Sequence, residues 1–414
     1  MAGGKLRGRS PAFLVSGATL AAFRIPGYRA LWAAGVAGAF GWSVSLIAVG
    51  WITLQVSNSA FAVGATFAAR LLPSLLFGIP MGSLVDRFDR RTTLVVVNAL
   101  GALALAGVAL LAVAGHLGLP ELLLLSLGLG IIDTTRGTAF QSYAFDLAGP
   151  EGATNAIALS NLGGQLASTV GALSGGVVLE RYGVGSAFLL AAALAAMAAA
   201  GLALSGRHTR RARSAQRLVP SFRYSITLIT RNRLVAIIAF VVIVNEVLGF
   251  AAITLMPTFA RDVLGSDAAG LGALSSVRSV GGIVGLIVLA RLGMGERGGR
   301  LLILATLGSG LALFGFSLSS SFAASLLLMA GVGLCWGVLD TLGQSLIQQS
   351  VADNERGAAM GIWFFAIGFG PFGHLALGAA ASVIGAPLAL AIDSAILAGI
   401  GLALVGAKAV RRLS

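Results

Sequence analysis

Ionisable side chains inside long apolar segments are the residues of this sequence that first indicate chemistry. Four acids and three arginines of the 414-residue chain lie in such segments: Asp133, Glu246, Asp340, Asp393, Arg70, Arg136 and Arg278. A charge at the centre of a bilayer costs roughly 2.5–3.5 kcal/mol on insertion scales, so such residues are rare and are either functional or paired with one another. We therefore expect substrate binding, proton transfer or buried ion pairs at these positions.

The spacing of three of these residues places them near the middle of a membrane. Arg70, Asp133 and Glu246 each lie twelve residues from one end of their apolar segment, about 18 Å along a helix. Arg136 follows Asp133 by three residues and shares its helical face. Glu246 has no basic residue in its own segment, which makes it the first candidate for a titrating group.

Twelve apolar segments contain these charges, and they predict an all-α integral membrane protein. Hydrophobic residues make up 57 % of the chain and charged residues 10 %, whereas soluble domains are about 25 % charged. Each segment approaches the ~20 residues that cross a bilayer as a helix, and none alternates as barrel strands would. The predicted spans are 30–54, 60–85, 92–114, 121–143, 155–179, 184–205, 234–256, 270–290, 301–318, 323–351, 357–382 and 387–407.

Several classes of function are excluded by what the sequence lacks. The single Cys335 rules out a disulfide scaffold and a cysteine-based metal site. The sequence contains no Walker A motif, no His-Glu-x-x-His and no Gly-x-Ser-x-Gly. We therefore expect no enzymatic activity, no cofactor and no metal.

The basic residues predict an orientation in the membrane. With the N-terminus inside, 23 of the 28 Arg and Lys residues fall on inner segments, and only Arg181 and Arg261 fall on outer loops. This asymmetry follows the positive-inside rule and predicts cytoplasmic termini with contacts to anionic lipid. The net charge of +13 does not indicate nucleic acid, because no soluble domain carries a basic face.

A basic linker at 207–217 divides the spans into six plus six, and the two sets resemble each other. An offset of 208 places Arg70 on Arg278, and an offset of 207 places Asp133 on Asp340. Such repeats predict two parallel halves around a central site. The expected domains are a tail at 1–29, a half at 30–205, a linker with an interfacial helix at 206–233, a half at 234–407 and a tail at 408–414.

The repeat leaves two interpretations of the matching charges open. Arg70–Asp133 and Arg278–Asp340 are buried pairs that hold each half together, or the same residues bind substrate or protons. Residues that we expect to line a substrate cavity are Arg70, Arg136, Arg278, Asn245 and Trp336. Candidates for proton coupling are Glu246, Asp133 and Asp340.

The sequence GSLVDRFDRR at 82–91 lies between the second and third spans and resembles motif A of the major facilitator superfamily, roughly G-x-L-x-D-R-x-G-R-R. Asp89 replaces the usual glycine. The expected gating residues are Gly82, Asp86, Arg87, Arg90, Arg91 and Asp146. In this interpretation Asp86 forms a charge latch at the inner face with Arg87, Arg90 or a neighbouring helix end, and Asp146 at the inner end of the fourth span is a further partner. The alternative is that the arginines only set topology.

Three further segments are similar to the drug:proton antiporter branch of that superfamily, which includes macrolide and siderophore exporters. They are FRIPGYRALW at 23–32, AARLLP at 68–73 and ATNAIAL at 153–159. Many members carry an acid in the first span, where this chain has Gly41-Trp42. The resemblance implies twelve helices and proton-coupled export of small amphiphilic compounds, such as drugs or siderophore-like metabolites, by alternating access.

The expected partners are a small-molecule substrate, protons and membrane lipids, and we expect a monomer in a bacterial inner membrane. Two alternatives share the fold. One is an uncoupled facilitator or importer of a small solute, and the other is a lipid flippase or scramblase.

Overall fold

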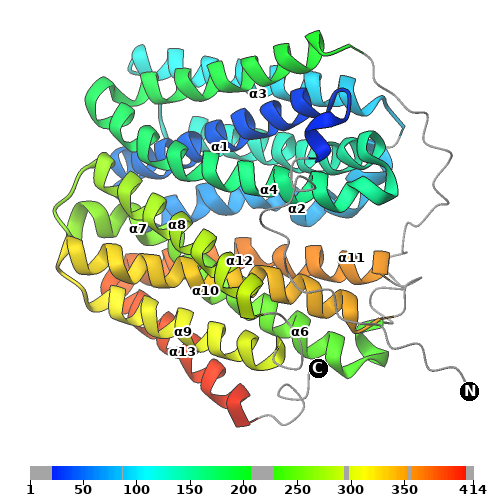
Figure 1. Ribbon diagram of the computed structural model, residues 1–414. Coiled ribbons are helices and arrows are strands. Elements are labelled where there is room, and N and C mark those ends of the chain that lie inside the picture. Colours follow the sequence, from blue (N-terminus) through cyan, green and yellow to red (C-terminus); the bar gives the residue numbers. More distant parts are fainter. Residues whose placement is uncertain (1–20, 86, 207–227, 293–297, 352–355, 407–414) are drawn as a thin grey trace, which may run out of the picture.

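The computed structural model describes residues 21–85, 87–206, 228–292, 298–351 and 356–406, and these residues contain helices and no strand (Figure 1). Residues 1–20 of the predicted N-terminal tail at 1–29, the predicted C-terminal tail at 408–414, most of the linker and Asp86 lie outside the described residues. Of the predicted interfacial helix, residues 228–231 are described as helical, and residue 233 begins α6.

The first group of helices precedes the linker. It comprises η1 (Ala21–Arg24), α1 (Tyr28–Ser57), α2 (Ala60–Val85), α3 (Arg90–Val113) and α4 (Leu119–Leu204). Non-helical backbone at Gly149 and Gly183, with φ of 69° and 80°, divides α4 into three helical stretches. Glycine adopts this left-handed conformation without a steric penalty, so the chain can turn back at both points. The three stretches overlap the fourth, fifth and sixth predicted spans.

The second group of helices follows the linker. It comprises α6 (Arg233–Val244), η2 (Asn245–Gly249), η3 (Phe250–Leu255), α7 (Met256–Thr258), η4 (Phe259–Val263), α8 (Ala268–Leu292), α9 (Gly298–Leu318), α10 (Phe322–Gln349), α11 (Arg356–Ile367), α12 (Gly370–Ile384) and α13 (Ala386–Gly406). The segment from α6 to η4 is continuous but irregular, because Asn245–Gly249 is π-helical and Phe250–Leu255 is a 3₁₀ helix. Such irregular turns inside a helix often mark functional positions. This span ends at Val263, seven residues beyond its predicted end.

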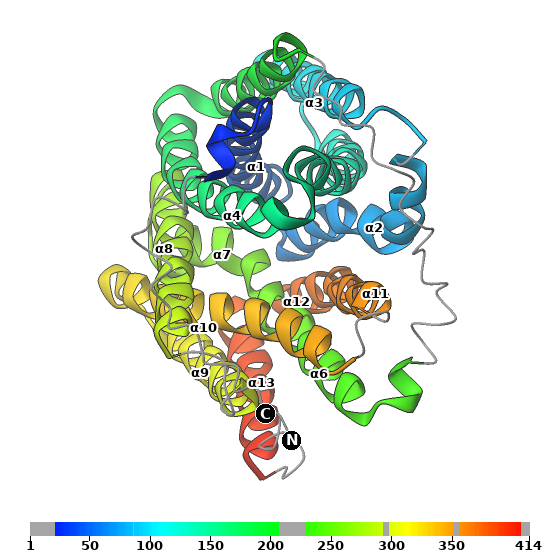
Figure 2. The same cartoon turned by 45° about the vertical axis from the view of Figure 1, so that its right-hand side comes forward.

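The two groups form separate halves that lie side by side (Figures 1 and 2). In the first half α1, α2 and α3 pack on α4, and in the second half α10 packs on α8 and α9, while α13 packs on α9. The halves meet mainly where α4 contacts α8 and where α2 contacts α12. A space between the halves is therefore bounded by helices from both.

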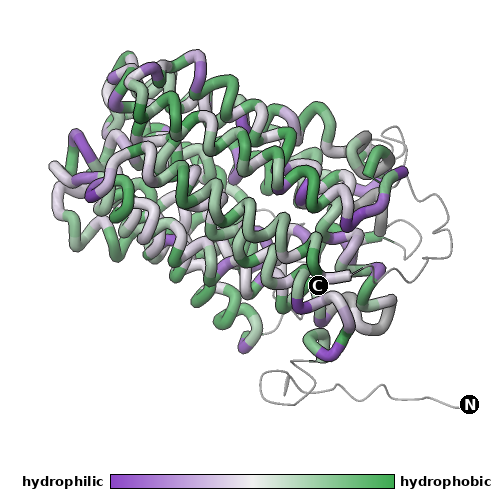
Figure 3. Tube along the Cα trace, turned by 90° about the horizontal axis from the view of Figure 1, so that it is seen from above, coloured by the Kyte–Doolittle hydropathy of each residue, from purple (hydrophilic) through white to green (hydrophobic). Residues whose placement is uncertain are grey.

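The surface of the bundle is apolar along its length, as expected for an integral multi-pass membrane protein. Ten helical segments among the described residues are long and apolar enough to cross a bilayer. Leu103 and Leu327 are 70 % and 77 % exposed, which is unfavourable in water but not in lipid. Hydrophilic positions gather toward the two ends of the bundle (Figure 3).

Candidate functional site

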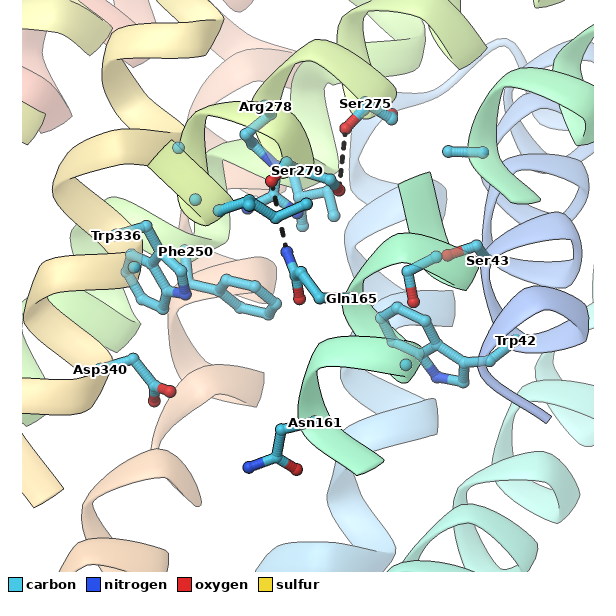
Figure 4. A pocket seen from close by; sticks show the side chains of 18 of the residues that line it. Trp42, Ser43, Asn161, Gln165, Phe250, Ser275, Arg278, Ser279, Trp336 and Asp340 are labelled. Atoms are coloured by element: carbon cyan, nitrogen blue, oxygen red, sulfur yellow. Dashed lines mark hydrogen bonds between the residues drawn. The ribbon is translucent and has the colours of Figure 1, made fainter. Parts of the chain in front are cut away.

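A cavity of about 790 Å³ lies between the two halves and is lined by both. Its volume is within the range of small-molecule sites, about 300–1,000 Å³. The polar side chains from the first half are all neutral and include Ser43, Asn161 and Gln165, whereas the second half contributes Arg278 and Asp340 (Figure 4). The charged side chains of this cavity therefore lie on one wall.

Aromatic rings line the middle of the cavity. Phe250 stacks on Trp336 with ring centroids 5.1 Å apart, and Trp42 from α1 lines the cavity as well (Figure 4). The guanidinium carbon of Arg278 lies 5.9 Å from the centroid of the Phe250 ring. Sequence reasoning predicted Trp336 but missed Phe250, which lies four residues after Glu246 and hence about one turn along the same span.

The buried charges of the first half form a closed cluster. Asp133 accepts from Arg70 at 2.9 and 3.0 Å and from Arg136 at 2.8 Å. Arg70, which is 6 % exposed, also donates to Ser45 Oγ at 3.1 Å. The predicted pairing of Arg70 with Asp133 is therefore present. All three charges line a separate small pocket of about 20 Å³, and Trp42 lies between this pocket and the large cavity.

Of the two interpretations left open for Arg278 and Asp340, the buried ion pair is not present among the described residues. Among the described residues Arg278 forms no ion pair, and its buried Nε has no hydrogen-bond partner. Asp340 likewise has no basic partner in the described part of the chain. Both residues line the large cavity, whereas their counterparts Arg70 and Asp133 do not.

The cause is a difference in helix register between the halves. In the first half the carbonyl of Arg70 abuts Gly130, three residues before Asp133. In the second half the carbonyl of Arg278 abuts Gly333, seven residues before Asp340. The packing of α8 on α10 is therefore shifted by four residues, about 6 Å along a helix, relative to α2 on α4.

Glu246 lies behind the cavity wall, in the π-helical turn of the seventh span. Its side chain is 7 % exposed and lines a small pocket of about 20 Å³ together with Asp340, Trp336 and Trp363. In the described part of the chain no basic side chain pairs with Glu246. Asp340 lines both this pocket and the large cavity, so it connects Glu246 to the cavity.

Asn245 does not line the large cavity. Its amide nitrogen donates to the carbonyl of Val241 at 2.8 Å and to Thr306 Oγ1 at 3.2 Å.

The described residues contain no group of three or more His, Cys, Asp or Glu side chains that could hold a metal ion.

The arginines of motif A make contacts within the first half. Arg90 forms an ion pair with Asp146, which joins α3 to α4. Arg91 donates to the carbonyls of Leu202 and Ala203 at 2.8 and 2.5 Å. Asp146 therefore pairs with Arg90, and the latch of Asp86 stays a prediction because Asp86 lies outside the described residues.

Two other motif A positions can be placed on the backbone. Arg87 follows α2 and is exposed, and Gly82 lies within α2. Asp89 replaces the glycine of the motif and caps α3, since its Oδ1 accepts from the backbone N–H of Thr92 at 2.7 Å. Aspartate is among the best N-caps, which explains this departure.

The halves are in close contact at the end of the bundle opposite motif A. Gly176 of α4 packs against the backbone of Gly272 in α8, and Gly64 of α2 packs against the carbonyl of His374 in α12. A side chain at either glycine would prevent this approach. The cavity is not enclosed, and its lining extends toward motif A as far as Gln141 and Gln344, so it opens at that end.

Polar contacts from three side chains also join the halves at the closed end. Glu180 accepts from the backbone N–H of Ala268 at 3.2 Å, and Ser382 Oγ accepts from that of Phe61 at 3.1 Å. Arg261 donates to Asn58 Oδ1 at 2.7 Å. The cavity is therefore open at one end and closed at the other. A transporter that works by alternating access exposes its central site to one side of the membrane at a time, and this arrangement fits one such state.

Comparisons with known proteins agree with this arrangement. The chain is 28 % identical over 386 residues to the multidrug efflux pump Tap of Mycobacterium tuberculosis, covering 89 % of this chain and 87 % of the pump. It is 26 % identical over 287 residues to the enterobactin exporter EntS of Shigella boydii, covering 68 % of this chain and 67 % of the exporter.

Solved structures show the same fold. A bacterial homologue of the human lysosomal transporter Spinster, inward-facing and unoccupied, superposes with a TM-score of 0.74 at 14 % identity, covering 94 % of this chain and 97 % of that one. The nucleoside transporter NupG superposes with a TM-score of 0.70 at 14 % identity, covering 92 % and 99 %. The sequence profile of the Major Facilitator Superfamily matches residues 31–373. This chain is therefore a membrane transporter, not an enzyme, and belongs to the Major Facilitator Superfamily.

Proposed function

We propose that the protein exports small amphiphilic compounds by alternating access, in exchange for protons. The cavity supports this proposal because it combines aromatic rings with an acid and an arginine on one wall. The names of the two curated relatives, a multidrug efflux pump and an enterobactin exporter, favour export over import. A substrate with an apolar body and a polar group matches such a lining.

The observation that carries the proton-coupling proposal is the position of Glu246 beside Asp340. Neither acid has a basic partner among the described residues, and only Asp340 reaches the large cavity. An acid in a membrane protein without a paired cation is a candidate proton carrier. Asp133 is held by two arginines, so we assign it a structural role and retain Glu246 and Asp340 as carriers.

Coupling requires that proton and substrate influence the same charge. A proton on Glu246 or Asp340 reduces the negative charge at the cavity wall, which weakens attraction for a cationic group of the substrate. A membrane potential of 100 mV adds about 2.3 kcal/mol for each charge that crosses the membrane. That free energy is sufficient to drive export against a gradient of tens-fold.

We also propose that the motif A end is cytoplasmic, so that the cavity loads substrate from inside. The distribution of Arg and Lys supports this orientation. In a Cys335→Ser background, a cysteine at Ser266 should react with an impermeant thiol reagent in intact cells, and a cysteine at Ser214 should not. Labelling at Ser214 alone would reverse the orientation.

The test of coupling is transport in inverted vesicles with an imposed pH gradient. Glu246→Gln should abolish pH-driven uptake of a fluorescent amphiphile and leave its exchange at equal concentrations intact. Glu121→Gln is the matched control, because Glu121 lies in the first turn of α4, away from the cavity.

Each other outcome identifies an alternative. Driven uptake that survives in Glu246→Gln and Asp340→Asn alike would refute the proposed carriers. Loss of exchange together with driven uptake would place Glu246 in substrate binding. Flux that follows only the substrate gradient would indicate an uncoupled facilitator, and transbilayer movement of a labelled phospholipid would indicate a scramblase.

A further inference from the structure

We propose that the large cavity binds a zwitterion with a planar aromatic body, whose anionic group pairs with Arg278 and whose cationic group pairs with Asp340. The ligand thereby completes, in the second half, the ion pair that Arg70 and Asp133 form in the first. This inference rests on the proposed function, because it names the substrate class of the same cavity.

Among the described residues no basic side chain lies opposite Asp340. In the first half the residue that abuts Gly130 is Arg70, which reaches Asp133 three residues further along α4. The repeat matches Gly130 with Gly337. In the second half Gly337 abuts the carbonyl of Gly282, a residue without a side chain. The position from which a cation would reach Asp340 is therefore open, and Gly282 lines the cavity there.

The guanidinium of Arg278 lacks an anionic partner among the described residues. Its Nε is buried without a hydrogen-bond partner. Its one cation–π contact among the described residues is with Phe250, whose ring centroid lies 5.9 Å from the guanidinium carbon. An unpaired buried charge costs several kcal/mol in a protein interior. A carboxylate is the natural partner of a guanidinium, since it accepts two parallel hydrogen bonds. Arg278 thus favours a ligand with an anionic group.

Two aromatic side chains line the cavity between these two charges. Phe250 and Trp336 lie between Arg278 and Asp340 in the cavity (Figure 4). Trp336 precedes Asp340 by four residues, one turn along α10. The facing wall contributes the neutral amides of Asn161 and Gln165. A ligand that fits both charges must therefore carry an apolar, preferably aromatic, body between its own charges.

The test uses rhodamine B, which carries a cationic ring system and a carboxylate, and its ethyl ester, which lacks the anion. Binding to the purified protein in nanodiscs is measured by fluorescence anisotropy, with empty nanodiscs as the blank. Because a charge-assisted hydrogen bond is stronger than a neutral one, we expect rhodamine B to bind at least about tenfold more tightly than the ester.

Two variants test the assignment of each charge. Arg278→Gln should bring the two affinities to within about twofold of each other by weakening rhodamine B alone. Asp340→Asn should weaken both dyes. Arg181→Gln is the matched control, because Arg181 is exposed and lies outside the cavity. Equal affinities in the wild-type protein, or equal weakening of both dyes in Arg278→Gln, would overturn the proposal.

A third variant rebuilds the missing ion pair from the protein itself. A β-carbon at residue 282 would lie 3.5 Å from both Gln165 Nε2 and the carbonyl of Gly333, which is ordinary contact. Gly282→Arg should therefore fold, pair with Asp340 and abolish binding of both dyes, while Gly282→Ala should retain it. Unimpaired dye binding by folded Gly282→Arg would refute the proposal. If Gly282→Arg fails to fold, the affinity ratio in Arg278→Gln decides.

Transport in proteoliposomes separates this inference from the proposed function. Dye discrimination in binding without transport of either dye would refute the proposed function and leave the assignment of the charges standing. Transport of both dyes at equal rates, with equal affinities, would support export and refute the zwitterion site.

Discussion

The two ends of the molecule are held together in different ways. At the motif A end the polar contacts of Arg90 and Arg91 stay within the first half. At the opposite end Glu180, Ser382 and Arg261 each make a contact that crosses between the halves. The polar contacts at the closed end therefore join the two halves, whereas those of Arg90 and Arg91 at the open end stay within the first half.

The contacts at the closed end share a feature: each one caps a helix terminus of the other half. The carboxylate of Glu180 lies at the N-terminus of α8, and the hydroxyl of Ser382 lies at the N-terminus of α2. The guanidinium of Arg261 lies at the C-terminus of α1 and also donates to the carbonyl of Leu54 at 3.4 Å. Acids at N-termini and bases at C-termini are favourable with the helix dipole, so opening this end uncovers helix ends on both sides.

The largest effect should come from the interior of the first half, away from both ends. Asp133→Asn removes the one acid between Arg70 and Arg136, and breaking a buried pair costs about 3–5 kcal/mol. We expect a large loss of folded protein in detergent, measured as the monodisperse fraction and the midpoint of thermal unfolding. Asp340→Asn is the matched control, because Asp340 forms no ion pair with any described residue.

A double variant tests whether this loss arises from an uncompensated charge. Arg70→Gln combined with Asp133→Asn should recover part of the folded fraction that either single change removes. If Asp133→Asn folds normally but does not transport, the cluster acts on substrate or protons and its structural assignment is wrong.

The second effect should come from the backbone contact at the closed end. Gly64→Leu places a side chain against the carbonyl of His374, and overpacking costs about 1–3 kcal/mol. The halves should therefore separate at that end. Spin labels at Tyr182 and Val383, which are 70 % and 84 % exposed, should report a longer distance by double electron–electron resonance.

The control for Gly64→Leu is the same substitution where space is open. A β-carbon at Gly107 meets no atom within 4 Å, so Gly107→Leu should leave the distance distribution unchanged. A Gly64→Leu protein with the wild-type distribution would show that α2 and α12 accommodate the side chain without separating.

Much of this architecture could be predicted from the sequence because lipid imposes simple requirements on length and polarity. The apolar segments and the Arg70–Asp133 pair follow from the cost of exposing backbone or charge to hydrocarbon. The same reasoning offered Arg278–Asp340 as a second buried pair, beside a role in binding substrate or protons, and this pair is absent among the described residues. Glycine contacts decide the register of α8 on α10, and a shift of one turn leaves the sequence repeat unchanged while separating the charges.

The side of each helix that faces the cavity was also beyond prediction. Arg70 and Arg136 were expected at the cavity, but they line the small pocket on the other side of Trp42. In a membrane helix nearly every face is apolar, so the hydrophobic pattern does not distinguish the interior from lipid. The contacts at the closed end join residues far apart in sequence, such as Asn58 and Arg261, and no local signal predicts them.

A smaller effect is expected at the motif A end. Asp146→Asn removes the ion pair that joins α3 to α4, which is about one-fifth exposed. The loss should lie near 1–2 kcal/mol of stability, between the values for exposed and buried charged contacts. Because the pair lies within one half, the distance between the spin labels at the closed end should not change. A change in that distance would show that motif A influences closure at the far end.

The smallest effect should come from single caps at the closed end. Glu180→Gln keeps an oxygen that can accept from the backbone of Ala268 but removes the charge at the N-terminus of α8. A charge at a helix end is worth about 0.3–1 kcal/mol, so the population closed at this end should fall by about two- to fivefold relative to the open one. Arg261→Gln should act in the same direction, and the double variant should show the sum of both free energies, because the two side chains cap different helices.

Glu180 is exposed, so salt should screen its charge, and wild-type protein at high ionic strength should approach the Glu180→Gln distribution. If Glu180→Gln and high salt both leave the spin-label distances unchanged, the glycine contacts alone hold this end closed, and the charged caps do not contribute to the difference between the two ends.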